Sequence, residues 1–172
     1  MHPSVKRNFL AEFDDRFAEE IISLGLRHCD SFVTALSGGA DSTGLALLAQ
    51  RYADATSKSH HAVIVDHGLR PNSKSEALRV KGRLFCLGIS SEIISISAPP
   101  PSSAVQEWAR FKRYEAMLAV ARKKKAVLLT AHHADDQAET VTMRLLRGSG
   151  LVGLAGVPML RSQHGVTIAR PV

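Results

Sequence analysis

The chain has 172 residues, of which 45% are hydrophobic and 22% are charged, as in an ordinary globular domain. Lysine and arginine number 22 against 16 acidic residues, and the resulting charge of +6 favours polyanionic partners such as nucleic acid. Two cysteines without a C-x-x-C pair argue against a disulfide framework and against a cysteine-held zinc or iron–sulfur site. No segment resembles a secretory signal or a membrane span, so we expect a cytoplasmic protein with no membrane partner.

The predicted elements alternate between helix and strand along the chain. An amphipathic helix that packs on the core is expected within residues 1–29, at about 4–26. Apolar runs predict five strands, at about 31–37, 61–66, 92–96, 126–132 and 166–169. Helices are expected between them at about 41–52, 72–87, 103–125 and 135–147, the third with a capping box at Ser103–Gln106. The pattern predicts one α/β domain over residues 1–172, with an open, mostly parallel five-stranded sheet and helices on both faces.

A glycine-rich turn joins the first predicted strand to the next helix, with the sequence Ser37-Gly38-Gly39-Ala40-Asp41-Ser42. Glycine lacks a Cβ, so the backbone can approach an anion closely there. The N–H groups and partial positive charge of a helix start also suit a phosphate. The chain contains no Walker A sequence, but Asp41 supplies a carboxylate for Mg²⁺. The alternative is a structural turn with Asp41 or Ser42 as an ordinary N-cap.

A second glycine-rich stretch, residues 148–153, matches the dinucleotide-binding pattern G-x-G-x-x-G. It follows a predicted helix rather than a strand, and no convincing helix comes after it. The context therefore argues against a dinucleotide site. We expect residues 148–165 to form a loop before the last strand.

Polar residues follow three of the predicted strands, where ligands bind in open α/β sheets. The glycine turn follows the first strand, Asp66 and His67 the second, and His132 and Asp136 the fourth. Each has a structural alternative: Asp66 as a turn acceptor, His132 as a core histidine, and Asp136 as a helix-start acid. Two arginines on one face of the long helix, Arg110 and Arg113, could equally be ordinary surface residues.

Several of these segments resemble a known family. The Ser-Gly-Gly-x-Asp-Ser turn after a strand resembles the PP-loop of the ATP pyrophosphatases. Residues 130–140 and 144–151 are similar to the second signature of the tRNA(Ile)-lysidine synthetases, and residues 65–70, 109–114 and 169–171 resemble further motifs of that family. The resemblance covers nearly the whole chain from Phe32 onward. It implies a Rossmann-like fold of the adenine nucleotide alpha hydrolase type.

The resemblance also implies a ligase that uses ATP and Mg²⁺, with isoleucine tRNA of CAU anticodon and free L-lysine as the other substrates. A wobble cytidine would be adenylated, and lysine would then displace AMP to give lysidine. Arg110 and Arg113 would steady the pentavalent phosphorus, His132 would act in acid–base chemistry, and Asp41 with Asp136 would bind Mg²⁺. The nucleotide would be held by residues of two strand ends: Ser37, Gly38, Gly39, Ala40, Asp41, Ser42, Asp66 and His67.

Two other functions remain open on the sequence. One is a tRNA thiolase, which uses the same loop and the same adenylation but generally needs reactive cysteines. The other is an adenine-nucleotide-binding module without turnover. Members of the lysidine synthetase family also carry further domains after this one, which help to grip the tRNA. A homodimer is one candidate assembly.

Overall fold

The computed structural model describes residues 3–131 and 159–171, with side chains described from residue 11 onward. The chain forms alternating helices and strands in this order: α1 (Pro3–Ser23), η1 (Leu26–His28), β1 (Ser31–Leu36), α2 (Ala40–Thr56), β2 (Ser59–Asp66), α3 (Ser73–Cys86), β3 (Ser91–Ser95), α4 (Val105–Lys123), β4 (Val127–Thr130), β5 (Leu160–Gln163) and β6 (Val166–Ala169).

The strands form one sheet in the order β3-β2-β1-β4-β6-β5. The neighbouring pairs from β3 to β6 are parallel, and β5 pairs antiparallel with β6. The predicted α/β class with a mostly parallel sheet is therefore confirmed. The prediction of five strands was wrong by one, because β5 lies in the segment that was expected to be a loop. Its sequence, Leu-Arg-Ser-Gln, has a single apolar residue, since an edge strand buries little side-chain surface.

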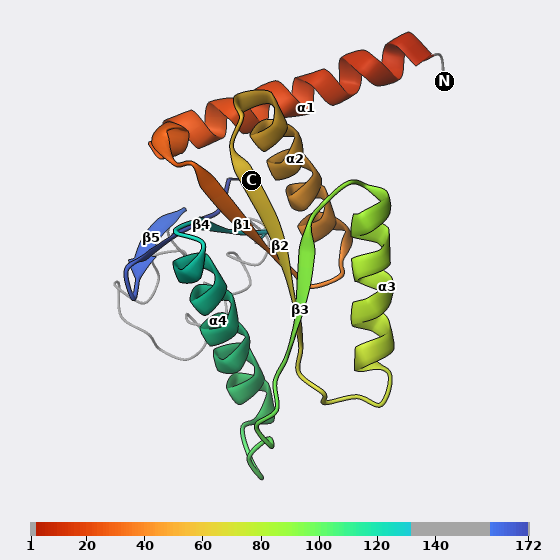
Figure 1. Ribbon diagram of the computed structural model, residues 1–172, viewed down its shortest axis with the longest axis vertical. Coiled ribbons are helices and arrows are strands. Elements are labelled where there is room, and N and C mark those ends of the chain that lie inside the picture. The colour runs from red at the N-terminus through yellow and green to blue at the C-terminus, as the bar shows by residue number, and fades with distance from the viewer. Residues whose placement is uncertain (1–2, 132–158, 172) are drawn as a thin grey trace, which may run out of the picture.

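Helices cover both faces of the sheet, as right-handed crossovers require (Figure 1). The connections β1–α2–β2 and β2–α3–β3 step in one direction along the sheet, so α2 and α3 lie on the same face. The connection through α4 steps back past β1 to β4, which places α4 on the opposite face. Helix α1 packs beside α2 on the same face of the sheet, where Phe17 of α1 and Phe32 of β1 contact the ring of Tyr52 edge-on.

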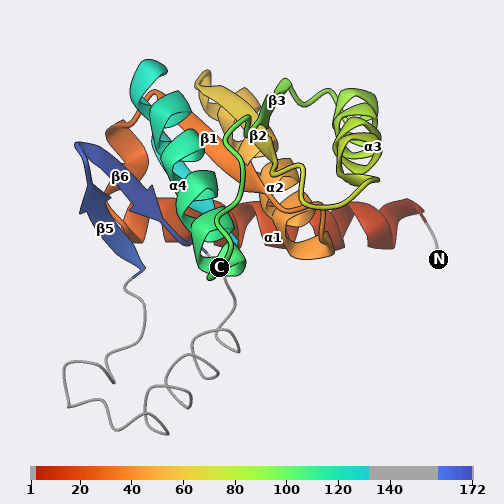
Figure 2. The same ribbon diagram turned by 90° about the horizontal axis from the view of Figure 1, so that it is seen from below.

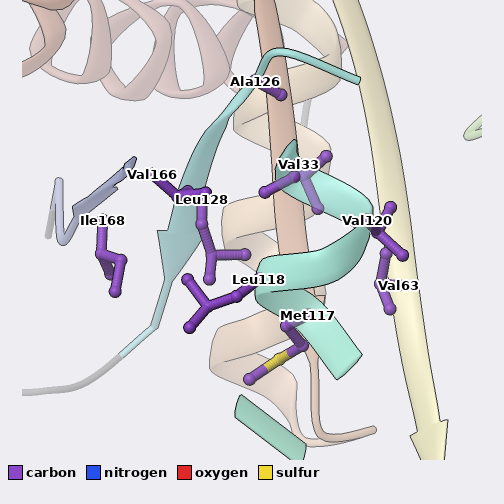
Figure 3. Packing of buried hydrophobic residues seen from close by; sticks show 10 residues of the cluster. Val33, Val63, Met117, Leu118, Val120, Ala126, Leu128, Val166 and Ile168 are labelled. Atoms are coloured by element: carbon purple, nitrogen blue, oxygen red, sulfur yellow. The ribbon is translucent and has the colours of Figure 1, made fainter. Parts of the chain in front are cut away.

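Alternate residues of the buried strands point to opposite faces and fill separate cores. On the α4 side, Val33, Val63 and Leu128 pack against Met117 and Leu118 (Figure 3). On the other side, residues such as Phe32, Ile64 and Leu129 pack under α1, α2 and α3. The central strands are buried on both faces, which explains why they consist of almost continuous apolar runs.

Two local predictions need adjustment. The capping box at Ser103 does not form: the residue before α4 is Ala104, in a left-handed conformation (φ 55°), and no side chain caps the helix. Helix α2 continues beyond Tyr52 to Thr56, where the Thr56 hydroxyl donates to the Tyr52 carbonyl. In the part of the chain that the structure describes, no helix has the length and apolarity needed to cross a bilayer.

Candidate functional site

The direction of the strand order changes between β1 and β4. From β1 the chain proceeds to β2 and β3 on one side, then returns to add β4, β6 and β5 on the other. At such a reversal the loops after the two central strands diverge to opposite faces and leave a crevice at the carboxyl edge, where ligands bind. The glycine turn follows β1 at this point, and Thr130 ends β4 beside it, in register with Ala35.

The glycine turn is braced by hydroxyl groups of its own residues. Ser42 Oγ lies 3.1 Å from Ser37 Oγ and donates to the Gly39 carbonyl at 3.1 Å. Thr43 Oγ1 donates to the same carbonyl at 2.9 Å. The N-cap of α2 is Gly39, without a side-chain cap, so the alternative in which Asp41 or Ser42 caps the helix was wrong. The exposed backbone of the turn therefore leads directly into a helix start.

Glycine is required at position 38 by its conformation and by its surroundings. Gly38 has a φ of 86°, which L side chains rarely adopt. A Cβ at this position would lie 3.2 Å from Val80 Cγ2, on α3. The turn is thus held against α3 and has no space for a side chain on that side.

Asp66 ends β2 at the same edge, and His67 follows it. Asp66 is 8% exposed and accepts a hydrogen bond from the Gly68 N–H at 3.0 Å, which is the structural role foreseen as its alternative. Burial lowers the pKa of His67 below its usual value, and the Arg113 guanidinium lowers it further, while Asp66 acts in the opposite direction. His67 is therefore neutral at physiological pH, and the structure brings it close to one of the two predicted arginines.

The structure adds three side chains to those predicted from the sequence. Arg170 directly follows β6, Arg161 lies on β5, and Tyr114 lies on α4 one residue after Arg113. The Arg161 guanidinium stacks over the Tyr114 ring, 5.3 Å from its centroid. Arg170 and Tyr114 lie in segments that resemble family motifs, residues 169–171 and 109–114, although neither was predicted as a site residue. Arg161 gave no such signal, since β5 was not predicted.

Arg170 is buried, with only 4% of its surface exposed. Burial lowers the pKa of its guanidinium from the usual value, and Arg161 and Arg110 act in the same direction, whereas a hydrogen bond with Tyr114 opposes them. An arginine nevertheless stays protonated in proteins. The carboxyl edge thus holds a buried, permanent positive charge two strands from β1, or about 10 Å at the usual strand spacing.

Several donors at this edge are buried and, among the described residues, have no hydrogen-bond partner: His67 Nδ1, Arg113 Nε, Thr130 Oγ1, Arg161 Nε, and Arg170 Nε and Nη1. Within the described ranges, 3–131 and 159–171, no carboxylate forms an ion pair with Arg110, Arg113, Arg161 or Arg170. Burying unpaired donors and charges is costly unless a partner is supplied. The arrangement is that of a site for an anion.

Two predicted residues, His132 and Asp136, lie outside the described residues, so their roles stay predictions. Asp41 is exposed in the first turn of α2. The described residues contain no group of three or more metal-ligating side chains. Mg²⁺ is usually held by one or two carboxylates together with substrate phosphates and water. The role of Asp41 as one of those carboxylates stays a prediction.

The fold defines a class: an α/β protein with a glycine turn at the point where the strand order of a mostly parallel sheet reverses, which is where such proteins bind phosphate-containing ligands. A comparison with protein families is more specific. The PP-loop domain family of ATP-binding proteins matches residues 6–172, and the chain therefore belongs to that family.

The chain is similar to curated proteins named tRNA(Ile)-lysidine synthase. It is 43% identical to the protein of Bradyrhizobium sp. (strain BTAi1) over 141 residues, which cover 80% of this chain and 39% of that protein. It is 42% identical to the protein of Methylobacterium nodulans, with coverage of 86% and 43%. The chain thus spans about two fifths of the length of these relatives.

Solved structures with low sequence identity share the fold. A U34-tRNA thiolase of Methanococcus maripaludis, which contains a [4Fe-4S] cluster, superposes with a TM-score of 0.77 at 20% identity over 96% of this chain and 60% of its own. An NAD⁺ synthetase of Burkholderia pseudomallei gives a TM-score of 0.52 at 19% identity, with coverage of 91% and 78%. These likenesses agree with the fold and say nothing about which substrate this chain uses.

Proposed function

We propose that this domain catalyses the ATP-dependent conversion of the wobble cytidine of isoleucine tRNA (CAU anticodon) to lysidine. The observation that carries the proposal is the carboxyl edge, which has a PP-loop after β1 and also holds arginines with no carboxylate partner among the described residues. The similarity to proteins named tRNA(Ile)-lysidine synthase, at about 40% identity, identifies the substrate to test. The net charge of +6 suits an RNA substrate.

The reaction has two steps. The 2-carbonyl oxygen of cytidine forms a bond to the α-phosphorus of ATP, and the bond to the β-phosphate breaks to release pyrophosphate. The ε-amine of lysine then forms a bond to C2 of the base, the C2–O bond breaks, and AMP leaves. The first step converts a poor leaving group, a carbonyl oxygen, into a phosphate ester that departs readily. Both steps develop negative charge on phosphate oxygens.

We assign the binding of these phosphates to residues of the carboxyl edge. The backbone from Ser37 to Gly39 and the start of α2 would hold the departing pyrophosphate. Arg110 and Arg113, one and two turns into α4, would donate to the α-phosphate as its charge increases, which is an effect worth about 2.7–4 kcal/mol per donor in comparable sites. His67, held neutral by burial beside Arg113, would accept or donate a single hydrogen bond at the nucleotide.

Mg²⁺ would offset the negative charge of the triphosphate when bound. We assign Asp41 as its carboxylate ligand, together with Asp136. His132 is proposed as an acid–base group of the reaction.

Thiolation is the competing chemistry for this fold. It generally requires reactive cysteines, and the chain has two. Cys29 precedes β1 at the amino edge of the sheet, and Cys86 ends α3. Neither lies at the carboxyl end of a strand. A double Cys29→Ser/Cys86→Ser variant should keep its activity if the product is lysidine, whereas loss of activity would favour thiolation.

The direct test measures pyrophosphate release by the full chain with ATP, L-lysine and an isoleucine tRNA transcript bearing the CAU anticodon. We expect release that depends on the tRNA, and incorporation of radiolabelled lysine into the tRNA. A transcript in which the wobble cytidine is replaced by guanosine should give neither product. ATP binding without pyrophosphate release from the CAU transcript would favour a binding module and would overturn the proposal.

A further inference from the structure

The side chain of Tyr114 lies between two arginines that come from a different part of the chain. The Arg161 guanidinium covers the face of its ring at 5.3 Å, and the Arg170 guanidinium interacts with its hydroxyl group. Tyr114 itself packs against the core beneath α4, next to Met117 and Leu118. One half-buried tyrosine therefore contacts both arginines while it is anchored in the core.

The two arginines are carried by the β5–β6 hairpin. Arg161 is paired with Ile168 across the ladder, and the Arg170 N–H donates to the Met159 carbonyl at 2.9 Å, so both residues lie at one end of the hairpin. That end is the carboxyl end of β6, which is the edge where the PP-loop lies. Side chains of arginine have many rotamers, and their orientation has to be fixed by contacts. Among the described residues, Tyr114 supplies those contacts from α4.

Among the described residues, no carboxylate compensates the charge of this pair. Arg170 is 4% exposed, Arg161 is half-buried, and both have an Nε without a hydrogen-bond partner among the described residues. A core that needed only packing would be more stable with apolar side chains in these positions. Two guanidiniums that are held together and left unpaired fit an oxygen anion, because a guanidinium donates to two oxygens in one plane.

We propose that Tyr114 is a positioning residue that holds Arg161 and Arg170 at the carboxyl edge as a paired site for an oxyanion of the reaction. The anion is a phosphate of the nucleotide or RNA, or the carboxylate of the amino-acid substrate. This inference rests on the proposed function for the identity of the substrates. The two halves of the contact have different chemistry: the ring stacks on Arg161, and the hydroxyl interacts with Arg170.

Conservative variants of the full chain separate the two halves. Tyr114→Phe keeps the ring and removes the hydroxyl, and it should lower kcat/KM about tenfold, the usual effect of a hydrogen bond to a charged group. Arg161→Lys keeps the charge and loses the planar stacking, and it should reduce kcat/KM severalfold. Tyr52→Phe is the matched control, since Tyr52 packs between Phe17 and Phe32 on the other face of the sheet. An increase in KM for ATP, for RNA or for lysine identifies which substrate supplies the anion.

A second measurement needs no turnover. At fixed ionic strength, inorganic phosphate or acetate should raise the Tm of the wild type relative to chloride, and this rise should be smaller in Tyr114→Phe and in Arg161→Gln. Arg122→Gln is the control, because Arg122 donates to the His164 carbonyl at the opposite end of the hairpin. If the wild type releases no pyrophosphate, the proposed function fails, and the Tm shifts still test the positioning role. Unchanged kcat/KM and unchanged Tm shifts in Tyr114→Phe would overturn it.

Discussion

The PP-loop offers a quantitative test at Gly38, where conformation and space both exclude a side chain. Gly38→Ala places a Cβ on a residue with a φ of 86°, at a backbone cost of about 1–2 kcal/mol. The new Cβ also lies 3.2 Å from Val80 Cγ2, so one of the two must move, which adds up to about 1 kcal/mol. We therefore expect the free energy of unfolding to fall by about 2 kcal/mol.

Urea denaturation of four variants separates the two contributions. Gly38→Ala in a Val80→Ala background should recover about 0.5–1 kcal/mol of the loss, since the contact is gone and only the backbone cost remains. Gly44→Ala is the matched control: a Cβ there meets nothing within 4 Å inside α2, and alanine should stabilise the helix by about 0.5–1 kcal/mol. A loss at Gly38 no larger than the change at Gly44, or no recovery with Val80→Ala, would refute this account of the turn.

Three further changes test other parts of the molecule. Burial lowers the pKa of His60 to about 4, so the unfolded chain takes up the proton first as the pH falls. The stability from neutral His60 is complete above about pH 6.5, and up to about 3 kcal/mol is lost by pH 4. Urea titrations at several pH values should show that His60→Gln loses less unfolding free energy on acidification than the wild type does. The exposed control His28→Gln should lose as much as the wild type. Asp41→Asn should lower kcat/KM by about 100-fold or more, with a raised Mg²⁺ requirement for pyrophosphate release, while unfolding free energy changes by less than about 1 kcal/mol. Ser103→Ala should change the unfolding free energy by less than about 0.5 kcal/mol, because Ser103 does not cap α4. A loss of about 1 kcal/mol would instead indicate that Ser103 caps the helix.

The His60 prediction depends on a chain of hydrogen bonds that runs from the buried Thr34 hydroxyl to Asp54 at the surface. His60 Nδ1 lies 3.0 Å from Gln50 Oε1, and Nε2 lies 2.8 Å from Thr34 Oγ1. The Gln50 amide nitrogen donates to Asp54 at 2.8 Å, which directs its oxygen towards the ring. The neutral imidazole therefore donates through Nδ1 and accepts from the Thr34 hydroxyl, so both nitrogens are satisfied without a charge. Protonation would add a buried charge and no new partner.

The parts of the fold that depend on local pattern were predictable from the sequence. The buried strand β4 and the second half of β2, residues 62–65, are almost entirely apolar, and polar residues begin where these runs end, so Asp66 could be assigned to the carboxyl edge in advance. β5 could not be predicted, because its four residues become a strand only by pairing with β6. The start of α4 was equally difficult to predict. The Ser103-x-x-Gln106 spacing is correct for a capping box, but Ala104 adopts a left-handed conformation and the helix begins after it.

The site likewise combines residues that local sequence pattern predicts with residues that are brought together only by contacts between distant segments. Motif residues of the PP-loop were found because their order along the chain is their order in space. The contact between Tyr114 and Arg161 joins residues far apart in the sequence through a hairpin that local pattern does not reveal. Arg170 lies between these cases, since its position after a buried strand was readable but its burial was not.

Helix α4 explains how the charge of this edge arises from an ordinary amphipathic pattern. Residues three, four, seven or eight apart lie on one side of a helix, so Arg110, Arg113 and Tyr114 share a stripe with Met117 and Leu118. The later part of that stripe is buried against the sheet (Figure 3). Because α4 runs back across the sheet from β3 to β4, its first turns lie at the carboxyl edge, which is the lower end of the strands in Figure 1 and faces the viewer in Figure 2. The side of the helix that seals the core therefore turns the arginines towards the ends of the strands, and packing of the apolar half fixes the position of the charged half.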